Sequence, residues 1–170
     1  MNVVKNIKDF IPKSNKNRPG NYMKPLYITV HNTANTKKKE QTQLITLVLL
    51  SDLARGGSWH YTVDENCIYQ HLPLNENGWH AGDGRGTGNM MSIGIEICEN
   101  ADGNFEKAVE NAQWLIRKLM QDQGIPLANV VPHKKDGAVN NVHESCLIAG
   151  IASRRVLQPL IQGKKQQQSR

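Results

Sequence analysis

Residues 27–33 read Tyr-Ile-Thr-Val-His-Asn-Thr, and the rest of the fold can be worked out from this stretch. Its alternation predicts a β-strand with Ile28 and Val30 on one face and Tyr27, Thr29 and His31 on the other. This pattern is typical of a strand packed on one side only. We therefore expect His31 to end a core strand on the face away from the aliphatic pair. A lone histidine there is most often satisfied by hydrogen bonds alone.

Further short motifs in the chain change that interpretation of His31. They are Trp59-His60-Tyr61, Trp79-His80-Ala81-Gly82, Ser92-Ile93-Gly94-Ile95-Glu96 and Val131-Pro132-His133. Each motif is weak alone, but the ordered set is specific. It resembles the zinc-dependent N-acetylmuramoyl-L-alanine amidases of the type-2 amidase family, especially the endolysins of Bacillus phages and prophages. The resemblance covers roughly residues 11–133.

This resemblance implies an α/β (α+β) fold, in which helices flank a central mixed β-sheet as in peptidoglycan-recognition-like amidase domains. We expect residues 1–150 to form the catalytic domain. Residues 151–170 are basic and of low complexity, and we predict a tail that is disordered at its end.

The sequence also predicts the individual elements. Two strands, 58–63 and 67–72, would form a hairpin, and residues 75–88 a long loop. A third strand covers 92–98. A helix from Phe105 to about Gln123 has Asn104 as its N-cap and Gly124 just past its end, and residues 129–133 would return to the sheet. Residues 11–23 are expected to be a loop before the first core strand.

The chemistry of the site follows from the resemblance. A catalytic zinc needs three protein ligands and one open position, and His31 and His133 match the two histidine ligands of the family. Glu96 matches its catalytic glutamate. The zinc would acidify water and polarise the scissile carbonyl, while Glu96 moves the proton. The implied bond joins the lactyl group of N-acetylmuramic acid to L-alanine.

Glu96 also stands out without the resemblance, because it lies in the middle of a strand opposite three isoleucines. A buried carboxylate is costly without a partner, so either that face is wet or a cation lies near. We predict His60, Trp79 and His80 as substrate-binding residues. For Trp79 and Trp59, stacking on a ligand and packing in the core both remain open.

The family's third ligand, a cysteine in a segment resembling Trp-Ser-Gly-Lys-x-Cys-Pro, is missing after His133. Back-translation of residues 137–150 can nevertheless read W-S-G-K-Q-C-P in the neighbouring frame. Residues 40–50, where the family has an alanine-rich helix, can similarly read A-D-A-A-N-H-A-R-F-V. Our hypothesis is that residues 40–50 and 137–170 are out-of-frame translation, and DNA codons incompatible with these strings would refute it. Cys146 remains a candidate third ligand.

The composition limits the partners and functions that the chain can have. The chain has 170 residues, 38% hydrophobic and 21% charged, with a net charge of +6 that favours anionic partners. We expect peptidoglycan as the partner. Nucleic acid is disfavoured because no helix-turn-helix, RRM or finger signature occurs, and we expect no membrane partner and a monomer. The alternative function is a wall-binding module with impaired catalysis.

The three cysteines include no CxxC pair, which is typical of a chain made in a reducing cytosol. The first residues lack the uninterrupted apolar stretch of a signal peptide. We therefore expect synthesis in the host cytoplasm without a signal peptide, and action on the cell wall after release.

Overall fold

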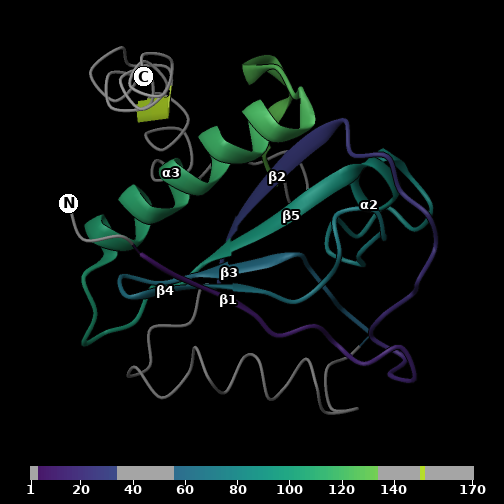
Figure 1. The fold of residues 1–170 in the computed structure, drawn as a ribbon, viewed down its shortest axis with the longest axis horizontal. Helices are drawn as coiled ribbons and strands as arrows, with labels where there is room; N and C mark the ends of the chain where they lie inside the picture. Colours follow the sequence, from purple (N-terminus) through teal and green to yellow (C-terminus); the bar gives the residue numbers. More distant parts are fainter. Residues whose placement is uncertain (1–3, 34–55, 134–149, 152–170) are drawn as a thin grey trace, which may run out of the picture.

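The computed structural model describes residues 4–33, 56–133 and 150–151, and its centre is a mixed sheet with a long helix lying across it (Figure 1). The strand order is β1-β4-β3-β5-β2-β6. The strands are β1 (Lys5–Lys8), β2 (Tyr27–Asn32), β3 (Tyr61–Val63), β4 (Cys67–Gln70), β5 (Ser92–Ile97) and β6 (Val130–Pro132); the helices are α2 (Thr87–Met91), α3 (Phe105–Gln123) and the short 3-10 helix η1 (Leu127–Asn129). The predicted mixed sheet flanked by helices is confirmed.

Most strand pairs are parallel, and the exception is the predicted hairpin. Strand β2 runs parallel to both β5 and β6, and β3 runs parallel to β5. Strands β3 and β4 are antiparallel, although each is shorter than expected. Strand β1, parallel to β4, was not predicted. Its sequence, Lys-Asn-Ile-Lys, has one apolar residue and is largely exposed, so it lacks the pattern that signals a strand.

The core lies between the sheet and α3. The apolar face of β2, Ile28 and Val30, and the three isoleucines of β5 are all buried there. Helix α3 begins as predicted, because the Asn104 side chain accepts a hydrogen bond from the Lys107 amide. It ends at Gly124, whose φ of 68° is the left-handed conformation that glycine adopts without strain. The predictions for this helix and for β5 are confirmed.

The prediction that β2 packs on one side only is wrong. Thr29 and His31, on the second face, are only 5% and 6% exposed. The Thr29 hydroxyl lies 2.6 Å from that of Ser92 on β5, and the His80 ring from the long loop contacts His31. A loop therefore covers this face, and short-range alternation carries no information about such a cover. The predicted loop ends in the five-residue helix α2, which was also not predicted.

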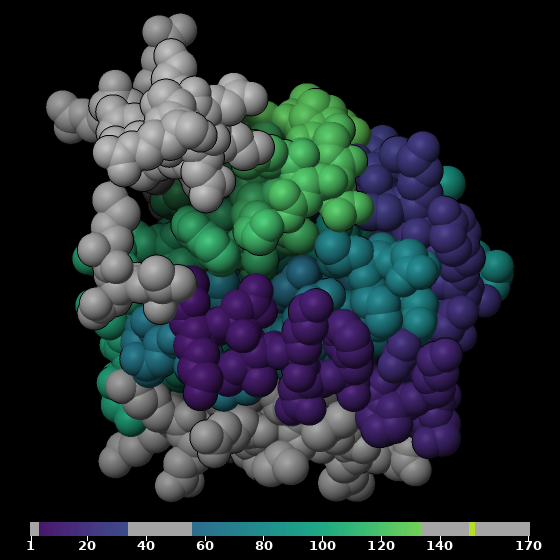
Figure 2. All heavy atoms as spheres, viewed as in Figure 1, coloured from purple at the N-terminus to yellow at the C-terminus, as the bar shows by residue number. Residues whose placement is uncertain are grey.

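Near the end of the described chain, Ile151 is 4% exposed and belongs to the core cluster. This first residue of the predicted tail therefore packs with the domain. In the space-filling view the N-terminal segment (purple) spreads across the face below α3 (green) (Figure 2). None of the described helices is long and apolar enough to span a membrane. The predictions for residues 40–50, for residues 137–149 including Cys146, and for 152–170 lie outside the described residues.

Candidate active site

The site starts from the pairing of β2 with β5. His31 lies directly beside Glu96 in this parallel register, so the two side chains project from the same face of the sheet. The Nδ1 atom of His31 lies 3.9 Å from Oε1 of Glu96, and the two side chains are 7% and 15% exposed. Burial, and repulsion from His80 and His133, lower the pKa of His31 to about 2. His31 is therefore neutral near pH 7, and the contact is not an ion pair.

His133 reaches the same place from the sheet edge. It follows β6, and its backbone amide donates to the Val30 carbonyl at 2.9 Å, which extends the β2–β6 pairing by one residue. Its ring centroid is 4.5 Å from that of His31. The adjacent strands β6, β2 and β5 thus bring together His133, His31 and Glu96, as expected from the sequence. Their chemical roles stay predictions.

His80 lies beside His31. Its Nδ1 is 3.1 Å from His31 Nε2, and its Nε2 is 3.2 Å from the Ser92 carbonyl. The ring rests directly on Gly94, since a Cβ built there would lie 2.7 Å from two ring carbons. Burial lowers the pKa of His80 to about 4. This histidine, predicted to bind substrate, is thus packed against the sheet and contacts His31.

In the neutral form of each imidazole, the hydrogen-bond partners decide which nitrogen carries the proton. A carbonyl only accepts, so His80 donates from Nε2 to Ser92, and its Nδ1 must accept from His31 Nε2. His133 likewise donates from Nε2 to the Ala81 carbonyl, 3.0 Å away. The nitrogens of His31 and His133 that keep a free lone pair are therefore both Nδ1.

His60, which the sequence predicts to bind substrate, is completely buried. Its Nε2 donates to the Glu76 carbonyl at 2.9 Å, and its Nδ1 accepts from the Gly94 amide at 3.0 Å. Burial lowers the pKa of His60 to about 3. This histidine fastens the long loop to the sheet. Its alternation within a strand-forming segment could not distinguish that role from a surface one.

The two tryptophans differ. Trp79 is half-buried, and its backbone is held by Ser58, whose amide donates to the Trp79 carbonyl at 3.0 Å. Its side chain remains a candidate for substrate contact. The Trp59 indole donates to the Thr62 hydroxyl at 2.8 Å, and the same hydroxyl lies 2.8 Å from Nε2 of the buried His71. For Trp59 the contacts favour packing.

Two polar residues of this region were missed from sequence, His71 and Asn89. Both are buried, at 0% and 3% exposure. His71 lies at the end of the hairpin, and Asn89 directly follows a glycine-rich stretch, where asparagine ordinarily indicates only a turn. No local pattern marks either residue, because the fold of the loop and of the hairpin is what brings each side chain to its partners.

The described residues fit part of a zinc site. Imidazole nitrogens are ligands that zinc prefers, and His31 and His133 present two imidazoles. Within residues 4–33, 56–133 and 150–151, no group of three His, Cys, Asp or Glu side chains is arranged to hold a metal ion. A third ligand would have to come from outside these ranges, where Cys146 lies.

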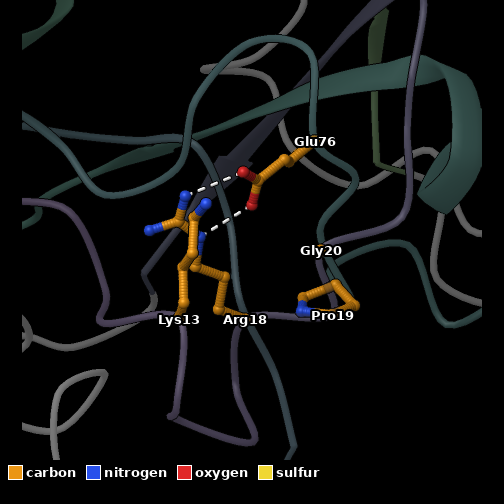
Figure 3. Close-up of a pocket in the computed structure, with 5 residues that line it drawn as sticks. All are labelled: Lys13, Arg18, Pro19, Gly20 and Glu76. Atoms are coloured by element: carbon orange, nitrogen blue, oxygen red, sulfur yellow. Dashed lines mark hydrogen bonds and ion pairs between the residues drawn. The ribbon is translucent and has the colours of Figure 1, made fainter.

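A separate pocket of about 240 Å³ lies near the N-terminal loop (Figure 3). The Arg18 guanidinium forms two hydrogen bonds of 2.7 Å with the Glu76 carboxylate, which lowers the pKa of that carboxyl. The lining residues are Lys13, Arg18, Pro19, Gly20 and Glu76, so neither the histidines nor Glu96 contribute. The ion pair secures the loop whose Glu76 carbonyl holds His60.

Comparisons of sequence and of structure relate this chain to known proteins. The model of the Amidase_2 family, described as N-acetylmuramoyl-L-alanine amidase, matches residues 21–146. The N-acetylmuramoyl-L-alanine amidase CwlH of Bacillus subtilis (strain 168) is 65% identical over 129 residues, which are 75% of this chain and 51% of CwlH. The amidase XlyA of the same organism is 62% identical over 132 residues, which are 78% of this chain and 44% of XlyA.

The fold of the XlyA catalytic domain superimposes on this chain with a TM-score of 0.80 at 56% identity, covering 87% of this chain and 99% of that domain. The chain spans about half the length of the curated relatives it matches.

Proposed function

Because the chain belongs to the Amidase_2 family of N-acetylmuramoyl-L-alanine amidases, we propose that it hydrolyses peptidoglycan at the amide between N-acetylmuramic acid and L-alanine of the stem peptide. The observation that carries the proposal is the meeting of His31, Glu96 and His133 on adjacent strands. A carboxylate beside two imidazoles fits zinc-assisted amide hydrolysis, in which a third ligand completes the metal site.

Glu96 would act as the general base and then as the general acid. It takes a proton from the attacking water, whose oxygen forms the new bond to the lactyl carbonyl carbon. It then passes this proton to the alanine nitrogen as the amide C–N bond breaks. The products are the free lactyl carboxyl group and a new amino terminus.

His31 and His133 would hold the zinc through Nδ1, with a third ligand from residues after His133. When bound, zinc supplies the Lewis acid that acidifies the water and polarises the scissile carbonyl. His80 supports this because its Nδ1 accepts a hydrogen bond from His31 Nε2–H, and such outer partners orient metal-binding imidazoles. The half-buried Trp79 is the side chain we propose for substrate contact.

The cellular role we propose is that of a phage-type lysin that is made in the host cytoplasm and degrades the wall after release. The net charge of +6 favours approach to an anionic, teichoic-acid-bearing wall. The alternative, a wall-binding module with impaired catalysis, is favoured by the absence of the family's Trp-Ser-Gly-Lys-x-Cys-Pro segment after His133.

The test is to incubate the protein and its Glu96→Gln variant with purified cell walls, and to measure turbidity and new amino termini. Glutamine matches the shape of glutamate but accepts no proton, so the rate should fall about 10²- to 10⁴-fold. Glu99→Gln is the control, because Glu99 lies nearby in the chain and its carboxylate accepts a hydrogen bond from the Asn32 side chain at 3.0 Å. Pelleting with walls without new amino termini would favour the binding module, and near-native turnover in Glu96→Gln would exclude the proposed role.

A further inference from the structure

A buried asparagine holds together the loop that carries His80. Asn89, in α2, is 3% exposed. Its Oδ1 accepts from the backbone amides of His80 and Ala81, each at 2.8 Å. Its Nδ2 donates to the Gly84 carbonyl at 2.9 Å. One side chain thus makes three hydrogen bonds across the loop.

The exposed Asp83 fixes Asn89 in turn. The Asp83 carboxylate accepts from the Gly88 amide at 2.7 Å and from the Asn89 amide at 3.1 Å. Both bonds are made to the first turn of α2, where a carboxylate compensates backbone amides that have no partner within the helix. The Asn89 side chain thus bonds to the start of the loop between His80 and Asn89, and the Asp83 side chain bonds to its end.

His80 and Ala81, whose backbone amides bond to Asn89, are also the residues that contact the imidazoles of His31 and His133. The Ala81 carbonyl accepts from His133 Nε2 at 3.0 Å, and His80 Nδ1 accepts from His31 Nε2 at 3.1 Å. Asn89 itself touches neither His31 nor His133 in any of these bonds. In the described residues, these bonds connect Asn89 to the two rings through the loop.

We propose that Asn89 is a positioning residue that selects the tautomers of His31 and His133. By fixing the Ala81 carbonyl and the His80 ring, it keeps the proton of both imidazoles on Nε2 and leaves both Nδ1 lone pairs available. The purpose of this arrangement rests on the proposed function, because those lone pairs would bind the metal. The tautomers themselves are a property of the metal-free chain.

The experiment reads the tautomers directly in the metal-free protein. Long-range ¹H–¹⁵N spectra of histidine-labelled protein near pH 7.5 distinguish Nε2–H from Nδ1–H, and spectra of His31→Ala and His133→Ala assign the signals. We expect the native chain to show Nε2–H at both rings. Asn89→Ala should shift both toward a mixture of the two forms. Asn89→Asp, which keeps the two acceptor bonds, should restore the native pattern.

The matched control is Asn111→Ala. Asn111 lies in α3, is 5% exposed and donates to the Asp64 carbonyl at 2.9 Å, so its loss also removes a buried amide. A general loss of stability would appear in both alanine variants, whereas the tautomer change should occur only in Asn89→Ala.

Native tautomers in a folded Asn89→Ala variant, or Nδ1–H at either ring of the native chain, would overturn the proposal. If circular dichroism shows that Asn89→Ala does not fold, Asp83→Ala decides, because this exposed residue supports Asn89 without filling the core. Unchanged tautomers in Asp83→Ala would then overturn it. Wall hydrolysis does not enter the measurement, so an inactive chain with Asn89-dependent tautomers would refute the proposed function alone.

Discussion

Replacing Gly94 by alanine should displace the His80 ring. Gly94 lies in β5, and a Cβ at this position would be 2.7 Å from Cγ and Cδ2 of His80 and 2.9 Å from its Nε2. Carbon atoms pack at about 3.5–4.0 Å, so the ring must retreat by roughly 1 Å. Its contacts of 3.1 Å with His31 and 3.2 Å with the Ser92 carbonyl would then exceed hydrogen-bonding distance.

Overpacking of this kind costs about 1–3 kcal/mol of folding free energy. The backbone contributes no further strain, since the φ of Gly94 is not in the left-handed region. In a chain of this size 1 kcal/mol corresponds to about 2–4 °C, so Gly94→Ala should lower the Tm by roughly 2–12 °C. Thermal unfolding by circular dichroism measures this shift.

Gly57→Ala is the matched control. The nearest atom to its added Cβ, the Trp79 carbonyl oxygen, is 3.6 Å away, an ordinary contact. Because alanine restricts the unfolded chain more than glycine, this variant should be unchanged or more stable by about 0.4–1 kcal/mol. Equal melting temperatures for Gly94→Ala and Gly57→Ala would show that the His80 ring does not rest on Gly94.

Three further predictions concern the metal, the tail and pH. His31→Ala should abolish zinc-dependent lysis while the domain stays folded, and activity that survives exhaustive chelation in this variant would rule out the metal assignment. Grafting Trp-Ser-Gly-Lys-Gln-Cys-Pro after His133 at family spacing should raise zinc stoichiometry and wall clearing together. Full zinc occupancy and equal wall clearing by the ungrafted chain would contradict this prediction. Burial lowers the pKa of His71 from 6.5 to about 4. The contribution of the neutral, buried His71 to the free energy of unfolding is therefore complete above pH 6.5 and is lost as pH falls toward 4. His71→Gln should therefore reduce the slope of unfolding free energy against pH by about 1.4 kcal/mol per unit in this range, measured by urea titration, and an unchanged slope would show that His71 is already protonated.

The sequence predicted elements whose signal is local. The alternation of β2 and β5 reports their apolar faces, and the cap at Asn104 and Gly124 reports the ends of α3. It did not predict β1, because an exposed edge strand needs no apolar pattern. Nor could alternation show that a loop covers the second face of β2.

The candidate site likewise has residues that the sequence could predict and polar contacts that it could not. Its expected members His31, Glu96 and His133 meet in the structure because each lies on or just after a strand with a recognisable pattern. The buried position of His60 and the loop bonds of Asn89 depend on partners brought together only by folding. Residue types at a strand end can therefore be predicted, while the polar contacts that orient them cannot.

Strand β6, which positions His133, lies at the edge of the sheet. Within the part of the chain that the structure describes, three residue pairs and the His133 amide bond join this strand to β2, and β6 is the last strand in the sheet order. Edge strands can open locally at a lower free energy than the core, so the site can come apart while the domain stays folded. A ligand that bridges His31 and His133 would act as a cross-link between chain positions far apart in sequence. It would slow amide hydrogen exchange in β6 more than in the interior strand β5.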